Sequence, residues 1–290
     1  MAGIMFMSGA IMGDFYGSPY EFHSNKNEEY VYNTILKGGE KNCQFTDDTI
    51  LTFAIMKWLS SPRVDKLTLI KILKDFVRRY PSSYGTHFAQ WALSGSIQPY
   101  NSCGNGSAMR VSPVGVYANS LEECLELAKL SAEVTHNHPE GIKGAQAVAA
   151  IVYLQNKGRG WNIDKICEYI TKTFGYDLNR TYEDIKSTYK WDGTCQGCVP
   201  EAIIIWRDEP DYYRAIAKAI ALGGDADTLA CIVGSMYSSP REDTEREFPV
   251  KVLNAAYYLI NPEFSEIAAN FVTSCTNRIF DEAFRRMAKE

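Results

Sequence analysis

The chain has 290 residues and 46% of them are hydrophobic, which is enough apolar material for one large folded core. Its net charge of −5 argues against a nucleic-acid backbone as the main partner, and no run of Lys or Arg contradicts this. No apolar stretch approaches the length of a membrane span, and the apolar start lacks the basic residues of a secretory signal. We therefore expect a soluble, cytoplasmic protein that does not bind membranes and is a monomer.

The N-terminal segment carries a glycine pattern and then a polar stretch. The apolar residues from Met1 to Met12 predict a buried first helix, and glycines at every fourth position from Gly9 would let a neighbouring helix approach closely. Pro19 ends this helix and projects Glu21 from a turn. Residues 23–44 are polar and are predicted to form a long loop, of the kind that often serves as a lid or binding loop.

Helical spacing of apolar residues dominates the rest of the chain, and no alternating strand pattern of useful length occurs. The helices that this periodicity predicts are 48–59, 64–80, 84–93, 120–134, 141–155, 162–174, 200–207, 211–222, 229–238, 250–260 and 265–289. The helix at 141–155 is rich in alanine and is predicted to be central. The sequence thus predicts an all-α fold: a single compact multi-helix domain over residues 1–290.

Acidic residues and threonines are concentrated at the start of two predicted helices. The segments read T-D-D-T at residues 46–49 and G-G-D-A-D-T at residues 223–228. One acidic residue in a first turn is ordinary capping, whereas two in each turn exceed what capping needs. If the turns converge, their carboxylates would repel one another, and a pair of bound cations would relieve that repulsion. Oxygen ligands suit Mg²⁺, Mn²⁺ or Ca²⁺ better than zinc. Two unrelated, well-capped helices remain the alternative.

Two further segments carry unusual chemistry. The glycines at residues 104–106, around Asn105, allow positive φ and close approach of backbone N–H groups to an anion, and Arg110 adds charge. A turn before a helix is the alternative. His136 and His138 could hold a metal, although a hydrogen-bonding role for one histidine or a simple exposed turn is the more frequent explanation.

The eight cysteines are scattered along the chain, and we expect them to be reduced. Cys195 and Cys198 form a lone C-x-x-C pair, whereas a zinc site would need a second pair at suitable spacing. We interpret them as loop cysteines that precede a helix with Pro200 near its first position.

Taken in chain order, these motifs resemble the ADP-ribosylglycohydrolase family, which includes the dinitrogenase-reductase-activating glycohydrolases and the ADP-ribosyl-arginine and ADP-ribosyl-serine hydrolases. The resemblance extends from Ser8 to about Tyr237. The motifs that carry it are Gly13-Asp14 with Gly17 and Glu21, T-D-D-T at 46–49, G-N-G at 104–106 with Met109-Arg110, Thr135-His136, and G-G-D-A-D-T at 223–228.

The resemblance implies an all-α orthogonal helical bundle with two Mg²⁺ or Mn²⁺ ions in a cleft. The positions that match the metal ligands are Thr46, Asp47, Asp48, Asp225, Asp227 and Thr228. Glu21, on a mobile segment, matches a catalytic glutamate, and Asp47 is expected to act with it. The positions that match substrate contacts are Ser102, Cys103, Gly104, Asn105, Gly106 and His136. Some family members carry an aromatic residue that stacks on the substrate where Cys103 stands, so the resemblance does not define the mode of adenine binding here.

The activity that the resemblance implies is hydrolysis of the glycosidic bond at C1″ of ADP-ribose attached to a protein side chain or a small molecule. The products would be ADP-ribose and the free acceptor. A two-metal phosphohydrolase of small nucleotides, which would cut the diphosphate, is one alternative. A non-catalytic ADP-ribose-binding protein is the other. The sequence does not define whether the acceptor is arginine, serine or another group.

Overall fold

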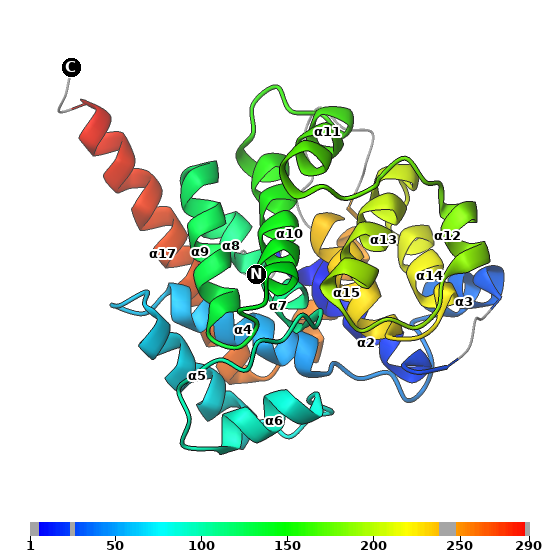
Figure 1. The fold of residues 1–290 in the computed structure, drawn as a ribbon, viewed down its shortest axis with the longest axis horizontal. Coiled ribbons are helices and arrows are strands. Elements are labelled where there is room, and N and C mark those ends of the chain that lie inside the picture. The colour runs from blue at the N-terminus through cyan, green and yellow to red at the C-terminus, as the bar shows by residue number, and fades with distance from the viewer. Residues whose placement is uncertain (1–5, 24–26, 238–247, 288–290) are drawn as a thin grey trace.

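The structure, a computed structural model, describes residues 6–23, 27–237 and 248–287, and the regular elements in these ranges are all helices (Figure 1). The predicted all-α fold is therefore confirmed. Instead of a sheet, these ranges contain two isolated bridges between loops, one joining His23 to Gly224 and the other joining Gly104 to Thr194. None of the described helices combines the length and apolar character needed to cross a membrane.

The described ranges contain a series of helices of different lengths. In chain order they are α2 (Ser8–Gly17), the 3₁₀ helix η1 (Ser18–Tyr20), α3 (Glu28–Leu36), α4 (Asp47–Leu59), α5 (Lys66–Arg79), α6 (Thr86–Leu93), α7 (Gly106–Met109), α8 (Ser112–Tyr117), α9 (Leu121–Glu133), α10 (Pro139–Lys157), α11 (Ile163–Phe174), α12 (Tyr182–Thr188), α13 (Cys195–Asp208), α14 (Tyr212–Leu222), α15 (Ala226–Tyr237), α16 (Val250–Leu259) and α17 (Pro262–Met287).

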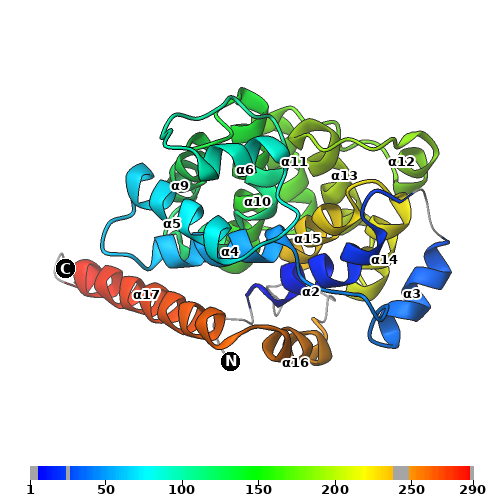
Figure 2. The ribbon, with the colours of Figure 1, turned by 90° about the horizontal axis from the view of Figure 1, so that it is seen from below.

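The first helix, α2, packs directly on α15 near the middle of the molecule, as both views show (Figures 1 and 2). Glycines make this crossing possible. A Cβ atom on Gly13 would collide with the carbonyl group of Ala230, and one on Gly17 would collide with the backbone of Asp227. Gly234 of α15 meets the backbone of α2 in the same way. The close approach predicted from the glycine pattern is thus present, and it places the polar residues of α2 beside the start of α15.

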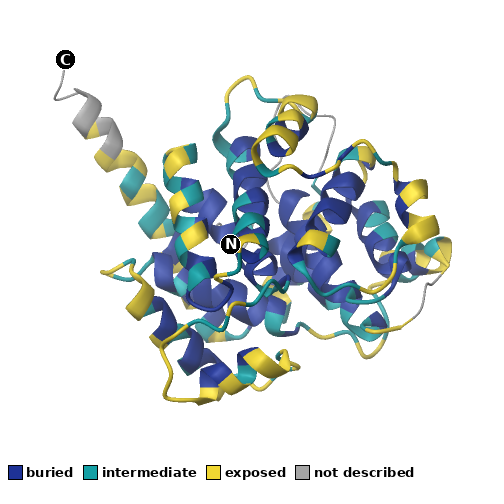
Figure 3. Ribbon diagram, in the orientation of Figure 1, coloured by how far each residue is buried: buried dark blue, intermediate teal, exposed yellow. Residues whose placement is uncertain are grey.

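Helix α10 has the central position predicted for residues 141–155. It packs against α7, α8, α9, α13 and α15, and most of its residues are buried (Figure 3). Helix α17 instead runs along the outside of the molecule beside α4 (Figure 2). Near its start, Phe264 stacks on Phe53 of α4 with ring centroids 4.4 Å apart.

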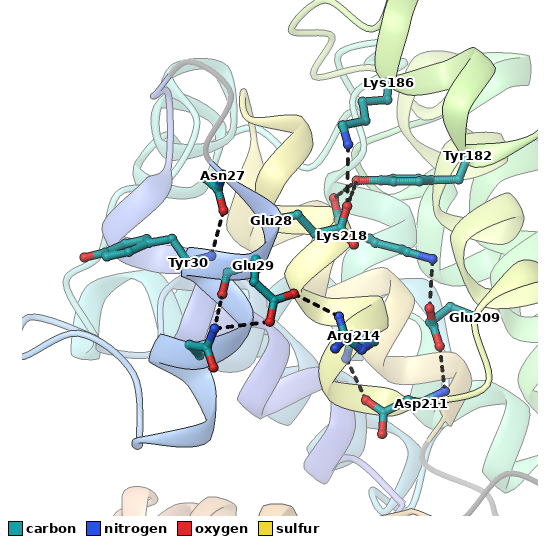
Figure 4. A network of polar contacts seen from close by, with 11 residues as sticks. Asn27, Glu28, Glu29, Tyr30, Tyr182, Lys186, Glu209, Asp211, Arg214 and Lys218 are labelled. Carbon is teal, nitrogen blue, oxygen red and sulfur yellow. Dashed lines mark hydrogen bonds and ion pairs between the residues drawn. The ribbon is translucent and has the colours of Figure 1, made fainter.

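The predicted long loop at residues 23–44 is wrong in part, because it contains α3. Asn27 caps this helix by accepting a hydrogen bond from the Tyr30 amide. Only Val31 and Ile35 of α3 are buried, so its apolar pattern is too sparse to predict a helix. Polar contacts hold it instead (Figure 4): Glu28 accepts a hydrogen bond from the Tyr182 hydroxyl at 3.3 Å.

Other boundaries also differ from the prediction. Helix α13 begins at Cys195 and contains Pro200, so Cys198 lies in a helix and not in the predicted loop. Thr194 provides the cap that sequence reasoning overlooked, because its hydroxyl accepts from the amide of Gly197. The short helices α7, α8 and α12 were not predicted. Residues 1–5, 238 and 288–289 of the predicted helices lie outside the described residues.

Candidate active site

The two acidic turns converge, because α4 and α15 begin next to each other beside α2. Carboxylate oxygens of Asp14, Asp48 and Asp227 lie within 4.8 Å of one another. The hydroxyl of Thr228 donates to Oδ2 of Asp48 at 3.2 Å and thereby joins the two turns. Thr46 precedes α4 but its side chain makes no capping bond, and it contacts Asp14 instead. Ordinary capping therefore does not explain these residues.

Asp14 lies at the centre of this arrangement, although sequence reasoning quoted it as part of a motif and gave it no role. It is fully buried and accepts hydrogen bonds from the amides and hydroxyls of Thr46 and Thr49, at 2.5–3.1 Å. These bonds fix the T-D-D-T turn against α2. A charged residue in the middle of an otherwise apolar first helix was the signal that could have identified it.

Glu21 joins the acidic group from a third direction. Its carboxylate lies within 4.8 Å of those of Asp225 and Asp227, although it is distant from both in sequence. The backbone beside it is tied to the G-G-D-A-D-T turn: the amide of Phe22 donates to the carbonyl of Gly224 at 2.6 Å. We refer to Asp14, Glu21, Asp47, Asp48, Asp225 and Asp227 as the acidic cluster.

Burial and mutual repulsion disfavour the charged forms in the acidic cluster. Burial raises the pKa of Asp14 to about 6, against the lowering effect of its threonine hydrogen bonds. Burial and the charges of Asp225 and Asp14 raise the pKa of Glu21 to about 7. Burial and Asp14 raise the pKa of Asp47 to about 8. The pKa values of Asp48 and Asp227 are raised well above their usual range for the same reasons.

A cavity of about 520 Å³ opens onto the acidic cluster. The cluster members that line it are Glu21, Asp47, Asp48, Asp225 and Asp227. Its other walls come from the loop before α7, from the Trp191–Thr194 segment, and from the residues between Ser83 and Phe88. The volume is in the range of pockets that hold nucleotide-sized ligands, about 300–1,000 Å³.

Most of the predicted substrate loop reaches this cavity, since Ser102, Gly104, Asn105 and Gly106 line it; Cys103 is not among the lining residues. Neither Gly104 nor Gly106 has positive φ, so that part of the prediction was wrong. Gly106 instead provides space, because a Cβ atom there would lie 3.1 Å from Nε2 of His136. Asn105 donates through Nδ2 to Oδ2 of Asp225 at 2.7 Å, which connects the loop to the acidic cluster.

The two histidines have different environments. His136 is buried and lines the cavity, so the exposed-turn interpretation does not hold for it. His138 caps α10 by accepting from the amide of Glu140 at 3.1 Å. Arg110, which was expected to add charge at the G-N-G loop, is fully buried although it borders the cavity, and it donates to the hydroxyl of Thr135.

Sequence reasoning missed an aromatic pair at the cavity. Phe22 and Trp191 both line it, are largely exposed, and meet edge to face with centroids 6.1 Å apart. Phe22 has a φ of 58°, in the left-handed region that residues with side chains seldom adopt. The only signal in the sequence was the position of Phe22 directly after Glu21.

The acidic cluster fits divalent cations that prefer oxygen ligands. Its donors are carboxylates with threonine hydroxyls beside them. In addition, Oδ1 of Asp48 is buried and has no hydrogen-bond partner within the described part of the chain. A buried carboxylate oxygen without a partner is costly, and cation binding would satisfy it. The cysteines are all free thiols, and both Cys195 and Cys198 are buried.

Comparisons with known proteins agree with this geometry. A putative ADP-ribosyl glycohydrolase, L543 of Acanthamoeba polyphaga mimivirus, is 25% identical over 279 residues that cover 80% of this chain and 84% of the relative. The ADP-ribosylhydrolase ARH3 of Homo sapiens is 26% identical over 299 residues, covering 79% of this chain and 82% of that protein.

A solved structure titled "ADP-ribosylglycohydrolase-related protein complex" superposes with a TM-score of 0.70 and covers 94% of this chain and 98% of that chain. Its sequence identity is 19%, so this likeness concerns the fold alone. The family model of the ADP-ribosylglycohydrolases matches residues 4–238, which is most of the chain. The resemblance stated from the motifs is thereby confirmed, and the protein belongs to the ADP-ribosylglycohydrolase family, whose chemistry is the hydrolysis of ADP-ribose linkages.

Proposed function

We propose that this protein hydrolyses the glycosidic bond at C1″ of ADP-ribose attached to a protein side chain or small molecule, and releases ADP-ribose. One observation carries the proposal. Glu21, Asp225 and Asp227 gather in a cavity of about 520 Å³ that His136 and the G-N-G loop also line. A ligand held by His136 and this loop would present its sugar to the carboxylates. Glycoside hydrolysis needs carboxylates at the bond that breaks, because its transition state resembles an oxocarbenium ion.

We further propose that two Mg²⁺ or Mn²⁺ ions bind in the acidic cluster. The residues that would hold them are Thr46, Asp47, Asp48, Asp225, Asp227 and Thr228. When bound, such ions polarise sugar or water oxygens. The structure adds a supporting role for Asp14, which holds the T-D-D-T turn through four hydrogen bonds and would keep these ligands in register.

Glu21 is the residue that we propose to move the proton. It lies at the cavity and at the edge of the acidic cluster, and the backbone beside it is fixed to Gly224. Its pKa, raised to about 7, suits a group that accepts and releases a proton near neutral pH. Asp47 also lines the cavity and would act beside Glu21 on the attacking water.

The test is a panel of substrates with ADP-ribose on arginine, on serine and on a nucleic-acid end, incubated with Mg²⁺ and analysed by mass spectrometry. We expect ADP-ribose and the unmodified acceptor from at least one substrate. Activity should disappear after dialysis against EDTA and return with Mg²⁺ or Mn²⁺, because all proposed ligands are hard oxygen donors. Better rescue by zinc than by Mg²⁺, or full activity in EDTA, would contradict the metal assignment.

The same panel separates the alternatives. A phosphohydrolase would convert free ADP-ribose to AMP and ribose 5-phosphate and would leave the glycosidic bonds intact. A binding protein would take up ADP-ribose, measured by calorimetry, and release nothing from any substrate. Either pattern would refute the proposed hydrolysis.

A further inference from the structure

Arg110 is a buried residue at the wall of the cavity, and its contacts are not those of an ion pair. The side chain is fully buried, and no carboxylate pairs with it among the contacts of the described residues. Its Nη2 atom donates to the backbone carbonyl of Ser131 at 3.1 Å and to Oγ1 of Thr135 at 3.0 Å. These two bonds use both hydrogens of Nη2. A guanidinium group has no acceptor atoms, so it can only donate to Thr135.

The hydrogen bond from Arg110 to Thr135 determines the direction of the hydrogen bond between Thr135 and His136. Oγ1 of Thr135 lies 2.7 Å from Nδ1 of His136, and no other acceptor for its hydroxyl hydrogen is found among the described residues. If His136 carried its proton on Nδ1, the buried hydroxyl hydrogen of Thr135 would have no acceptor, which is costly. With the hydroxyl donating to Nδ1, the Thr135 hydroxyl and Nδ1 of His136 are both satisfied, whereas Nε and Nη1 of Arg110 have no hydrogen-bond partner among the described residues. The ring proton is then on Nε2.

The Nε2 atom faces the substrate loop. A Cβ atom on Gly106 would be 3.1 Å from Nε2, and one on Gly104 would be 3.6 Å away, so both glycines leave room in front of it. All three residues line the cavity. The ring also stays uncharged, because burial and the nearby charge of Arg110 hold the pKa of His136 well below its usual range.

We propose that Arg110 and Thr135 are positioning residues that fix His136 as the neutral Nε2–H tautomer, so that it offers one N–H donor to an oxygen atom of the bound ligand. That oxygen belongs to a phosphate or to a ribose hydroxyl. The identity of the ligand rests on the proposed function, whereas the tautomer does not. The role of the G-N-G glycines follows directly: a side chain at Gly106 would cover the donor.

The tautomer can be measured by long-range ¹H–¹⁵N correlation NMR, which distinguishes the two ring nitrogens. The chain has only four histidines, and His136→Gln assigns the signal of interest. We expect His136 in the wild-type protein to be neutral, with the proton on Nε2. Thr135→Val should abolish this fixed tautomer, and Thr135→Ser should restore it, since serine keeps the hydroxyl. A charged ring or an Nδ1–H tautomer in the wild type would overturn the proposal.

Ligand binding is measured on the same variants with ADP-ribose, ADP and AMP in the presence of Mg²⁺. We expect Thr135→Val to weaken binding by about threefold to tenfold, the effect of one misdirected hydrogen bond, with rescue in Thr135→Ser. If Thr135→Val binds both ADP and ADP-ribose more weakly, the oxygen that accepts the His136 hydrogen bond belongs to the diphosphate. If only ADP-ribose binding is weakened, that oxygen belongs to the terminal ribose. Equal affinities of wild type and Thr135→Val would overturn the proposal. A wild type that has the expected tautomer but binds none of the three ligands would refute the proposed function and leave the tautomer assignment upheld.

Discussion

Glu21 shows how one residue acquires a reactive character from its surroundings. As an isolated side chain it would be ionised well below neutral pH. Partial burial and the carboxylates of Asp225 and Asp14 raise its pKa to about 7. Asp14, Asp48 and Asp227 are buried, and Asp14 and Asp48 accept hydrogen bonds from threonine hydroxyls. Glu21 also lines the cavity, which supports the proposal that it exchanges a proton with a ligand there.

Glu21→Gln is predicted to retain ADP-ribose binding and to lose most hydrolysis. Glutamine keeps the size and polarity of the side chain but cannot transfer a proton, and such losses typically cost about a hundredfold or more in rate. Single-turnover release of ADP-ribose gives the rate, and calorimetry with Mg²⁺ gives the affinity. Glu126→Gln, an exposed glutamate on α9, is the matched control and should behave as wild type. A Glu21→Gln rate within a few-fold of wild type would mean that another group moves the proton.

At the scale of elements, the α2–α15 crossing decides where the carboxylates meet. Gly13 stands against the carbonyl of Ala230, and the next residue, Asp14, reaches the start of α4. Helix α2 therefore approaches α15 at Gly13 and holds the T-D-D-T turn through the adjacent Asp14. The crossing of α2 and α15 thus affects both the packing of the core and the positions of the carboxylates in the acidic cluster.

Gly13→Ala is predicted to destabilise the protein and to weaken Mg²⁺ binding together. The added methyl group would force α2 away from α15, at a cost of about 1–3 kcal/mol or more for overpacking. Thermal unfolding measures the first effect and Mg²⁺ titration the second. Gly95→Ala is the matched control, because a Cβ atom there meets nothing within 4 Å. If Gly13→Ala is destabilised but keeps the Mg²⁺ affinity of the wild type, the α2–α15 crossing does not determine the geometry of the metal site.

The elements also show where sequence reasoning succeeded and where it could not. Long helices such as α10 and α14 follow a dense apolar pattern, and the glycine spacing of α2 indicated a close crossing. Helix α3 buries only two residues and is held by polar contacts to α12 and α14 that no local pattern contains (Figure 4). From the motifs, we expected the two acidic turns to meet in one metal site. That Asp14 anchors one of them depends on tertiary packing.

For the molecule as a whole, the acidic cluster makes metal-free stability depend on pH. Raised pKa values mean that the folded state binds protons more tightly than the unfolded chain does. The stability that this tighter proton binding adds to the folded state is fully present below the unfolded pKa values, which are 3.8 for Asp and 4.5 for Glu. It is lost as the pH rises through folded values of about 6 for Asp14, about 7 for Glu21 and about 8 for Asp47.

We therefore predict that the melting temperature in EDTA falls between about pH 5 and about pH 8, and that Mg²⁺ reverses the loss at the higher pH. At a hundredfold excess over the dissociation constant, one bound ion adds about 2.7 kcal/mol. That corresponds to a shift of several degrees. A melting temperature in EDTA that is constant or rises over this interval would contradict the repulsion within the acidic cluster.

Asp227→Asn should raise the melting temperature of the metal-free protein at about pH 8, because it removes a carboxyl group whose charged form is disfavoured by burial and by the neighbouring carboxylates. The same substitution should abolish the gain from Mg²⁺, so the order of wild type and variant reverses when the metal is added. Asp281→Asn, which changes an exposed carboxylate on α17, controls for net charge. If Asp227→Asn resembles this control with and without Mg²⁺, the two acidic turns do not share a metal site.

The α2–α15 crossing also has a consequence for the order of folding during synthesis. Helix α2 packs against helices that come much later in the chain. For example, the hydroxyl of Tyr212, on α14, donates to the carbonyl of Gly9 across 203 positions. The apolar α2 is therefore made well before α15 and cannot be covered until the ribosome has released α15. Domains with such distant contacts fold slowly and expose apolar surface meanwhile. Nascent chains that end before Ala226 should thus bind chaperones and resist compaction, and the acidic residues would come together only in the last stage of folding.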